Sequence, residues 1–317
     1  MNQNKLYRAV KNYGISVLRA IILFAFSFII VYPVIFMISN SIKVQADTLN
    51  PAVNLFSRTP TLYGFKAAFV ALDFFGSLRN TLVFEIISAI IEVLACSFYA
   101  YGLARFDFPL KKILMLFLIV TILVPDVMLI IPRLLNFRYM DFLGILGLIK
   151  RLTGLELRPD ITDTVLPFYL PSLFGVGLKS GIFIFIYMQF FKGLPAELEE
   201  AASIDGATSL RTFLCIILPS SGVVFLTVFI FSFIWHWNDT LLATMYTTHN
   251  HTLATILSNI GSYITFATVQ GKIVNDQNLL YGAPLAACII FIAIPLALYL
   301  ILQRKFIQSI DRVGIVG

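Results

Sequence analysis

Four charged residues lie inside stretches that are otherwise almost free of charge, where a charge is costly. They are Glu85, Glu92, Asp126 and Lys179. Carboxylates and an ammonium group in such surroundings can form an ion pair or face a polar cavity. Glu92 and Lys179 fall at similar depths in their stretches, so we expect them to pair across a helix bundle or to share a cavity. The alternative is that Lys179 extends along apolar surface to an interface.

Motifs of the common enzyme classes are absent from the sequence. It contains no GxxxxGK[ST] loop for nucleotide phosphates, no GxSxG elbow and no HExxH helix. His249 and His251, with His236 nearby, have no carboxylate or cysteine beside them, which favours a polar loop over a metal site. The three cysteines are far apart and suggest neither a disulfide framework nor a zinc site. We therefore expect no catalytic residue, no cofactor-binding residue and no metal ligand.

The elements that must position the four charges are membrane-spanning helices. Of the 317 residues 59% are hydrophobic and 13% are charged, against about 45–50% and 25% in soluble proteins. About 20 apolar residues are needed to cross a bilayer. Stretches with no charge or at most two charges are residues 20–42, 80–104, 113–132, 164–191, 212–238 and 277–303. The predicted fold is all-α, a polytopic membrane protein with six transmembrane helices.

Basic residues set the predicted orientation. Six crossings place both termini on one side, and the basic residues are denser in the segments on that side, which indicates a cytoplasmic location. The net charge of +6 is spread along the chain, so no nucleic-acid-binding face is expected. Basic residues in the external loop 133–162 interleave with acids, which suggests a folded, salt-bridged loop. The apolar piece 142–149 is too short to cross and is predicted to be interfacial or re-entrant.

One long polar loop, residues 192–219, has the local pattern of two short helices with a bend. Pro195 suits a first helical position, and acids follow near the positive end of the helix dipole. Gly206 can adopt positive φ and end this helix, and Thr208 or Ser209 can cap the next one. Pro219 marks the entry to the fifth span. Such a helix pair can dock on a partner or lie on the membrane.

The same loop resembles the EAA signature of binding-protein-dependent ABC importer permeases. The match consists of Glu200-Ala201-Ala202, three residues, Gly206, nine residues, and Ile216-x-Leu218-Pro219. In that family the loop is the coupling helix, which seats in a cleft of a cytoplasmic ATPase subunit. We call residues 192–219 the coupling segment. The resemblance implies an ATPase-coupling surface made of Glu200, Ala201, Ala202, Asp205, Gly206, Leu210 and Pro219.

The resemblance covers most of the chain and implies a type I ABC importer permease fold. Residues 99–105, Tyr-Ala-Tyr-Gly-Leu-Ala-Arg, look like the family's second-helix ending, and Trp237-Asn238-Asp239 resembles the close of the fifth span in the carbohydrate-uptake, MalG-like branch. The implied regions are a cytoplasmic segment 1–19, a permease domain 20–303 and a tail 304–317, with external loops 43–79, 133–163 and 239–276. The loop 133–162 looks long for the family, and the tail matches its usual ending only loosely.

The implied function is alternating-access transport of a sugar or oligosaccharide. The partners would be a second homologous permease, two ATP-binding subunits that use ATP and magnesium, an extracytoplasmic solute-binding protein and membrane lipid. Sugars are bound by aromatic faces and a few fixed polar groups, so the expected lining is Asp126, Trp235, Trp237, Asn238 and Glu85. Trp235, His236 and Trp237 could instead form an interfacial aromatic belt. Alternatives are another solute class, an ATP-independent channel, a secondary transporter or a membrane-embedded hydrolase.

Overall fold

A computed structural model describes residues 3–53, 55–141, 144–273 and 279–313 of the chain, and these residues contain helices and no strand. The chain divides into two compact units. The first consists of residues 1–73 and 259–293, and the second of residues 74–258 and 294–317. The all-α prediction is therefore confirmed over the described residues. Residues 314–317 of the predicted tail lie outside the described part.

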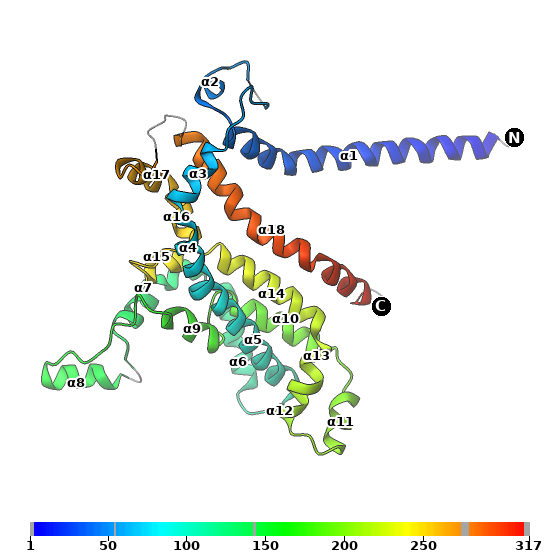
Figure 1. Ribbon diagram of the computed structural model, residues 1–317. Helices are drawn as coiled ribbons and strands as arrows, with labels where there is room; N and C mark the ends of the chain where they lie inside the picture. Colours follow the sequence, from blue (N-terminus) through cyan, green and yellow to red (C-terminus); the bar gives the residue numbers. More distant parts are fainter. Residues whose placement is uncertain (1–2, 54, 142–143, 274–278, 314–317) are drawn as a thin grey trace. The chain divides into compact units, whose positions relative to one another are not determined.

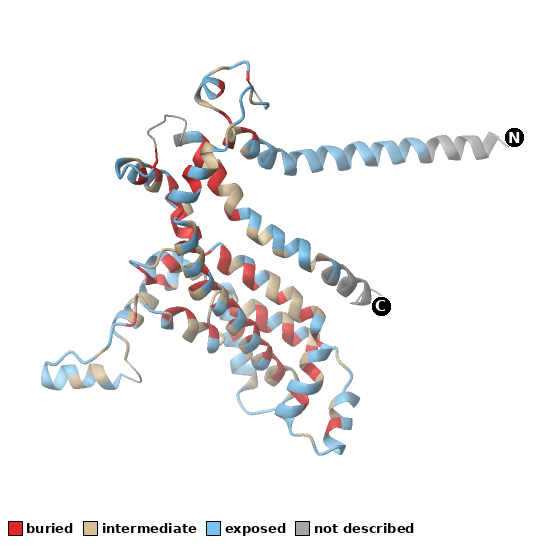
Figure 2. Cartoon of the chain, in the orientation of Figure 1, coloured by how far each residue is buried: buried red, intermediate tan, exposed pale blue. Residues whose placement is uncertain are grey.

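Five helices contribute to the first unit: α1 (Gln3–Ser41), α2 (Gln45–Thr48), α3 (Tyr63–Ala71), α17 (Ile260–Val269) and the beginning of α18 (Leu279–Val313). Most of α1 from Tyr13 onward is exposed (Figure 2). Gly64 allows a close approach here, because a Cβ atom at this position would lie 2.6 Å from the carbonyl oxygen of Ser41. Within α2, Asp47 accepts a hydrogen bond from the Ser57 hydroxyl at 2.6 Å, which lowers the pKa of Asp47.

The second unit contains the remaining helices. They are α4 (Phe74–Asn80), the π-helix η1 (Thr81–Ile86), α5 (Ile87–Arg105), α6 (Lys111–Leu123), α7 (Asp126–Arg138), α8 (Ile145–Thr153), α9 (Leu166–Leu173), α10 (Ser180–Lys192), α11 (Glu197–Ile204), α12 (Ser209–Thr212), the π-helix η2 (Phe213–Ile217), α13 (Leu218–Ser220), α14 (Gly222–Trp237), α15 (Leu241–Tyr246) and α16 (Leu253–Ser258). Helix α5 packs against α9, α10 and α14, and so forms the centre of this unit (Figure 1). Helices α11 and α12 lie at one end of the unit, and α15 and α16 lie at the other.

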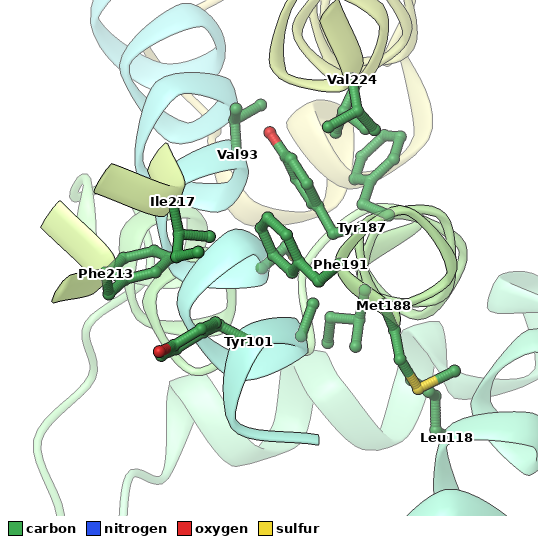
Figure 3. Close-up of a cluster of buried hydrophobic side chains, with 14 residues drawn as sticks. Val93, Tyr101, Leu118, Tyr187, Met188, Phe191, Phe213, Ile217 and Val224 are labelled. Atoms are coloured by element: carbon green, nitrogen blue, oxygen red, sulfur yellow. The ribbon is translucent and has the colours of Figure 1, made fainter. Parts of the chain in front are cut away.

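The core of the second unit combines aliphatic and aromatic side chains (Figure 3). Tyr187 and Phe191 stack with ring centroids 5.8 Å apart, and Tyr101 and Phe213 have centroids 5.0 Å apart. These rings come from α10, α5 and η2, so the core joins the central helices directly to the coupling segment. Such ring pairs add about 0.5–1.5 kcal/mol each beyond the area that they bury.

Three of the six predicted spans are single apolar helical stretches, and three are not. Residues 13–41, 74–105 and 281–304 are long and apolar enough to cross a membrane. The predicted span 113–132 is broken at Pro125, with α6 and α7 bent by 106°. The predicted span 212–238 bends by 80° between α13 and α14. The predicted span 164–191 is divided into α9 and α10, which are separated by residues with positive φ at Gly175 and Lys179.

The loop after α7 is salt-bridged, as the sequence predicts. Glu156 pairs with Lys150 at 2.5 Å and with Arg158 at 2.7 Å. The hydrogen bond from Arg158 is the main reason that the pKa of Glu156 is well below its usual range. Helix α8 begins at Ile145 and is exposed, and residues 142–143 of the predicted interfacial piece lie outside the described residues.

Candidate functional site

The coupling segment has the predicted pair of helices and the predicted bend. Helix α11 begins two residues after Pro195 and ends before Gly206, whose φ is +75°. The backbone N–H of Ala207 donates to the carbonyl of Ala202 at 2.9 Å, as in a Schellman-type helix end. The side chain of Thr208 then caps α12 by accepting from the backbone N–H of Arg211 at 3.4 Å. The local sequence therefore accounts for this pair of short helices.

The surface of the coupling segment is exposed and mixed in character. The predicted coupling residues that are exposed are Glu200, Ala201, Asp205, Gly206, Leu210 and Pro219. Ala202 is buried at 4% exposure, so it packs inside its own chain and cannot form part of an open docking surface. Ile204, which the motif did not single out, is 87% exposed. Ile204 thus adds apolar area beside the exposed acids of α11.

An ion pair fixes the coupling segment to the end of α5. Arg105 Nε lies 3.1 Å from Glu199 Oε1, and an Arg105 Nη atom donates to the Leu194 carbonyl at 2.7 Å. Both partners are partly buried, which strengthens a charge-assisted contact relative to an exposed one. Since Leu194 precedes α11 and Glu199 lies within it, α11 is held to α5 at two points.

A second group of polar residues is buried between α5, α10 and α14, together with η1. His236 Nδ1 lies 3.0 Å from Glu85 Oε2, and His236 Nε2 lies 3.0 Å from Glu92 Oε2. Ser232 donates to Glu92 Oε2 at 3.2 Å, and Ser180 donates to Glu92 Oε1. Glu85, Glu92 and His236 are 1%, 0% and 4% exposed. We call the five residues Glu85, Glu92, Ser180, Ser232 and His236 the buried cluster.

The local sequence explains how the buried cluster forms. Glu85 lies in η1 and Glu92 lies two turns later in α5, so both face the same side of one continuous helical stretch. Gly177 lets the segment between α9 and α10 approach Glu92, because a Cβ atom at residue 177 would lie 2.7 Å from Glu92 Oε1. Each nitrogen of the His236 ring faces a carboxylate oxygen, so each hydrogen bond needs one proton, carried by the ring nitrogen or by the carboxyl group, and the ring bridges the two acids.

Lys179 does not pair with Glu92, which corrects the predicted ion pair. Lys179 Nζ lies 2.5 Å from Asp126 Oδ2, whereas Glu92 contacts His236 and two serines. The reason is the two helix breaks. Asp126 begins α7 directly after the Pro125 break, and Lys179 is the residue before α10, so neither is at the depth that a straight helix would give it.

A polar cavity of about 260 Å³ surrounds the Asp126–Lys179 pair. The polar side chains that line it come from Thr121, Asp126, Arg133, Lys179 and Ser180. We call it the polar cavity. The side chains of Asp126 and Lys179 are 24% and 35% exposed, so both remain accessible from it.

The other residues of the predicted sugar lining are not brought together with Asp126. Trp237 is 1% exposed and stacks on Phe233 at 5.7 Å, and Trp235 packs against Phe183 at 5.5 Å. Asn238 donates to the carbonyl of Ile234, and Glu85 belongs to the buried cluster. Both tryptophans therefore serve core packing. His236, which we assigned to an aromatic belt, is the centre of the buried cluster instead.

Comparisons with known proteins agree with this architecture. A model of the family described as "Binding-protein-dependent transport system inner membrane component" matches residues 93–312. The chain is 23% identical to the sn-glycerol-3-phosphate transport system permease protein UgpE of Shigella flexneri, over 83% of this chain and 82% of that protein. It is 24% identical to a probable starch degradation products transport system permease protein, AmyC of Thermoanaerobacterium thermosulfurigenes, over 88% of this chain and 89% of that protein.

A solved structure shares the fold. The crystal structure of a bacterial ABC transporter involved in the import of the acidic polysaccharide alginate superposes with a TM-score of 0.69 at 18% identity. The match covers 93% of this chain and 98% of that chain. The helix breaks and the coupling segment therefore belong to a chain with the fold of a known importer subunit.

Proposed function

The chain belongs to the family of binding-protein-dependent transport system inner membrane components and is a permease subunit of an ABC importer, and we propose that its solute is a sugar or oligosaccharide. The relative named for starch degradation products supports this solute class, and the relative named for sn-glycerol-3-phosphate keeps a different solute, a phosphorylated polyol, as the alternative. The coupling segment, an exposed helix pair tied to the central helix α5, is the observation that carries the role of the chain as a permease subunit.

The proposed complex contains two permeases, two cytoplasmic ATP-binding subunits and an extracytoplasmic solute-binding protein. The ATP-binding subunits hold ATP and magnesium, and this chain contributes no covalent chemistry. Both termini and the coupling segment face the cytoplasm, and residues 20–303 form the permease domain. The exposed acids of α11, together with Ile204 and Leu210, support a docking role for this segment, because they offer both charge and apolar area to a partner.

The connections of the coupling segment suggest how movement would be transmitted. The Arg105–Glu199 pair holds α11 to α5, and the chain continues from α12 through η2 and α13 to α14. A displacement of the docked segment would therefore move α5 and α14. We propose that closure of the ATP-binding subunits drives alternating access through these two helices, as rigid packed elements transmit displacement.

The proposed solute contact is the polar cavity. Its ion pair and its hydroxyl groups can exchange hydrogen bonds with sugar hydroxyls. The proposal is supported by Asp126, one of the predicted lining residues, because Asp126 lines this cavity. The complete complex, reconstituted in vesicles with its binding protein, should take up labelled oligosaccharide only when ATP is supplied. Solute movement without ATP would indicate a channel or a secondary transporter instead.

Substitution of Lys179 tests the solute contact. Lys179→Ala leaves Asp126 without its counter-ion, and we expect the maximal uptake rate to fall about tenfold, the size of one lost charge-assisted hydrogen bond. The control is the swap Asp126→Lys with Lys179→Asp, which keeps the pair and should recover part of the loss. Wild-type uptake by Lys179→Ala in assembled complexes would contradict the assignment.

Charge reversal at Glu200 tests the docking surface. Glu200 is exposed, and we expect Glu200→Lys to reduce the amount of ATP-binding subunit that co-purifies with the permease. The matched control is Asp107→Lys, because Asp107 is exposed in the loop after α5 but lies outside the coupling segment. Equal recovery of the ATP-binding subunit with both variants would argue against docking at α11.

A further inference from the structure

Two cavities reach the buried cluster. Ser180 lines the polar cavity and donates to Glu92, so the cluster has one member in that cavity. A second cavity, of about 20 Å³, is lined by the polar residues Glu85, Arg133, Ser172, His236, Asp239 and Tyr246. We call it the small cavity. Arg133 lines both cavities and therefore connects them.

Two buried polar atoms at the small cavity have no hydrogen-bond partner within the described part of the chain. They are Glu85 Oε1 and the Tyr246 hydroxyl, in residues that are 1% and 2% exposed. Buried polar atoms are almost always hydrogen-bonded, either to protein or to ordered water. A volume of about 20 Å³ holds one water molecule, which needs roughly 10–15 Å³ by this measure. A metal cation fits poorly, because the Arg133 guanidinium lines the same space.

We propose that the small cavity binds one structural water that joins Glu85, Tyr246 and Arg133, and that the buried cluster thereby senses whether the polar cavity is occupied. The water completes a hydrogen-bonded chain with both ends at the polar cavity. One end is Arg133, which reaches Glu85 through the water, and the other is Ser180, which reaches Glu92 directly. His236 bridges the two carboxylates between these ends.

A solute that bonds Ser180 or Arg133 changes the hydrogen bonding of Glu92 or Glu85. Those carboxylates hold His236 and Ser232 of α14 against η1 and α5. Helix α14 leads back through α13 and η2 to the coupling segment, and the Arg105–Glu199 pair at the end of α5 holds the same segment. The hydrogen-bonded network thus connects the polar cavity to the coupling segment. This inference rests on the proposed function, since it requires a transported solute.

Ser232→Ala tests the connection between the polar cavity and the coupling segment, which we call the relay, without removing a contact to the solute. Ser232 bonds Glu92 but does not line the polar cavity, so its loss cannot remove a direct solute contact. In the reconstituted complete complex, we measure the ratio of ATP hydrolysis with solute-loaded binding protein to hydrolysis without it. We expect this ratio to fall about fivefold, at the lower end of measured coupling between sites. The control is Ser97→Ala in α5, because Ser97 is buried and donates to the Leu94 carbonyl of its own helix, outside the buried cluster.

Tyr246→Phe tests the water separately. It removes one of the three groups that hold the water and keeps the ring packing, so we expect a similar fall in the ratio. Density for a water between Glu85 and Tyr246 in a high-resolution cryo-EM map of the complex would support the site, and its absence would overturn it. Unchanged ratios in both variants, with normal ATP-driven uptake by the wild type, would overturn the relay. Absence of ATP-driven uptake in the wild type would instead refute the proposed function.

Discussion

Replacement of His236 by leucine should reduce the stability of the protein by about 3–5 kcal/mol. The substitution leaves Glu85 and Glu92 buried at 1% and 0% exposure without the ring that bridges them. Removal of one partner from a buried charge cluster leaves uncompensated charge in a low-dielectric interior, and that cost is typically of this size. The measurement is the midpoint temperature of the detergent-solubilised permease, together with the yield of assembled complex.

The control for His236→Leu removes the charges of Glu85 and Glu92, which lose their partner in that variant. Adding Glu85→Gln and Glu92→Gln removes the stranded charges, so we expect most of the lost stability to return. The triple variant should nevertheless respond to solute less than the wild type does, because the bridge between the two helices is absent. If His236→Leu is as stable as the wild type, the three residues do not form a charged cluster.

The local structure of the coupling segment was predictable because its determinants act over a few residues. Gly206 ends α11 through positive φ, and Thr208 caps α12 through its own side chain. Neither depends on distant packing. The burial of Ala202 was not predictable in this way, because it results from the fold of α11 against the following residues.

The partners of the buried charges were not predictable from position in the sequence. The predicted depth of each charged residue in the membrane assumes straight spans. The breaks at Pro125 and at residues 175–179 make this assumption wrong for Asp126 and Lys179. The break at Pro125 had a visible signal, since proline interrupts the hydrogen-bond ladder. The separation of α9 from α10 depends on positive φ at Lys179, which its residue type does not suggest.

The role of His236 also required tertiary structure. Its neighbours Trp235 and Trp237 suggested an interfacial belt, but both rings pack in the core and the histidine between them lies against α5 and η1. A signal was present in the sequence. Glu85 and Glu92 are seven residues apart and thus share one helix face, so a third polar group was needed to compensate them.

The largest expected effect on transport is that of Gly206→Val, which should abolish solute uptake while ATP hydrolysis continues. Gly206 has a φ of +75°, where a residue with a Cβ atom costs about 1–2 kcal/mol and a β-branched residue is least tolerated. Apart from residue 206 and its two chain neighbours, no heavy atom of the described residues lies within 4 Å of the Cβ position, so the strain comes from the backbone and not from a clash. Relief of the strain changes the angle between α11 and α12, and the docking surface loses its shape.

The matched variant for this prediction is Gly206→Asn. Asparagine adopts positive φ more readily than other residues with a side chain, so it adds a polar group of similar bulk at modest backbone cost. Uptake by proteoliposomes containing the complete complex, measured beside ATP hydrolysis, should be retained for asparagine and lost for valine. Equal loss in both variants would mean that the surface at residue 206 matters rather than its backbone. Equal retention would mean that the bend between α11 and α12 is not needed for coupling, since the strained valine would then have moved it without effect.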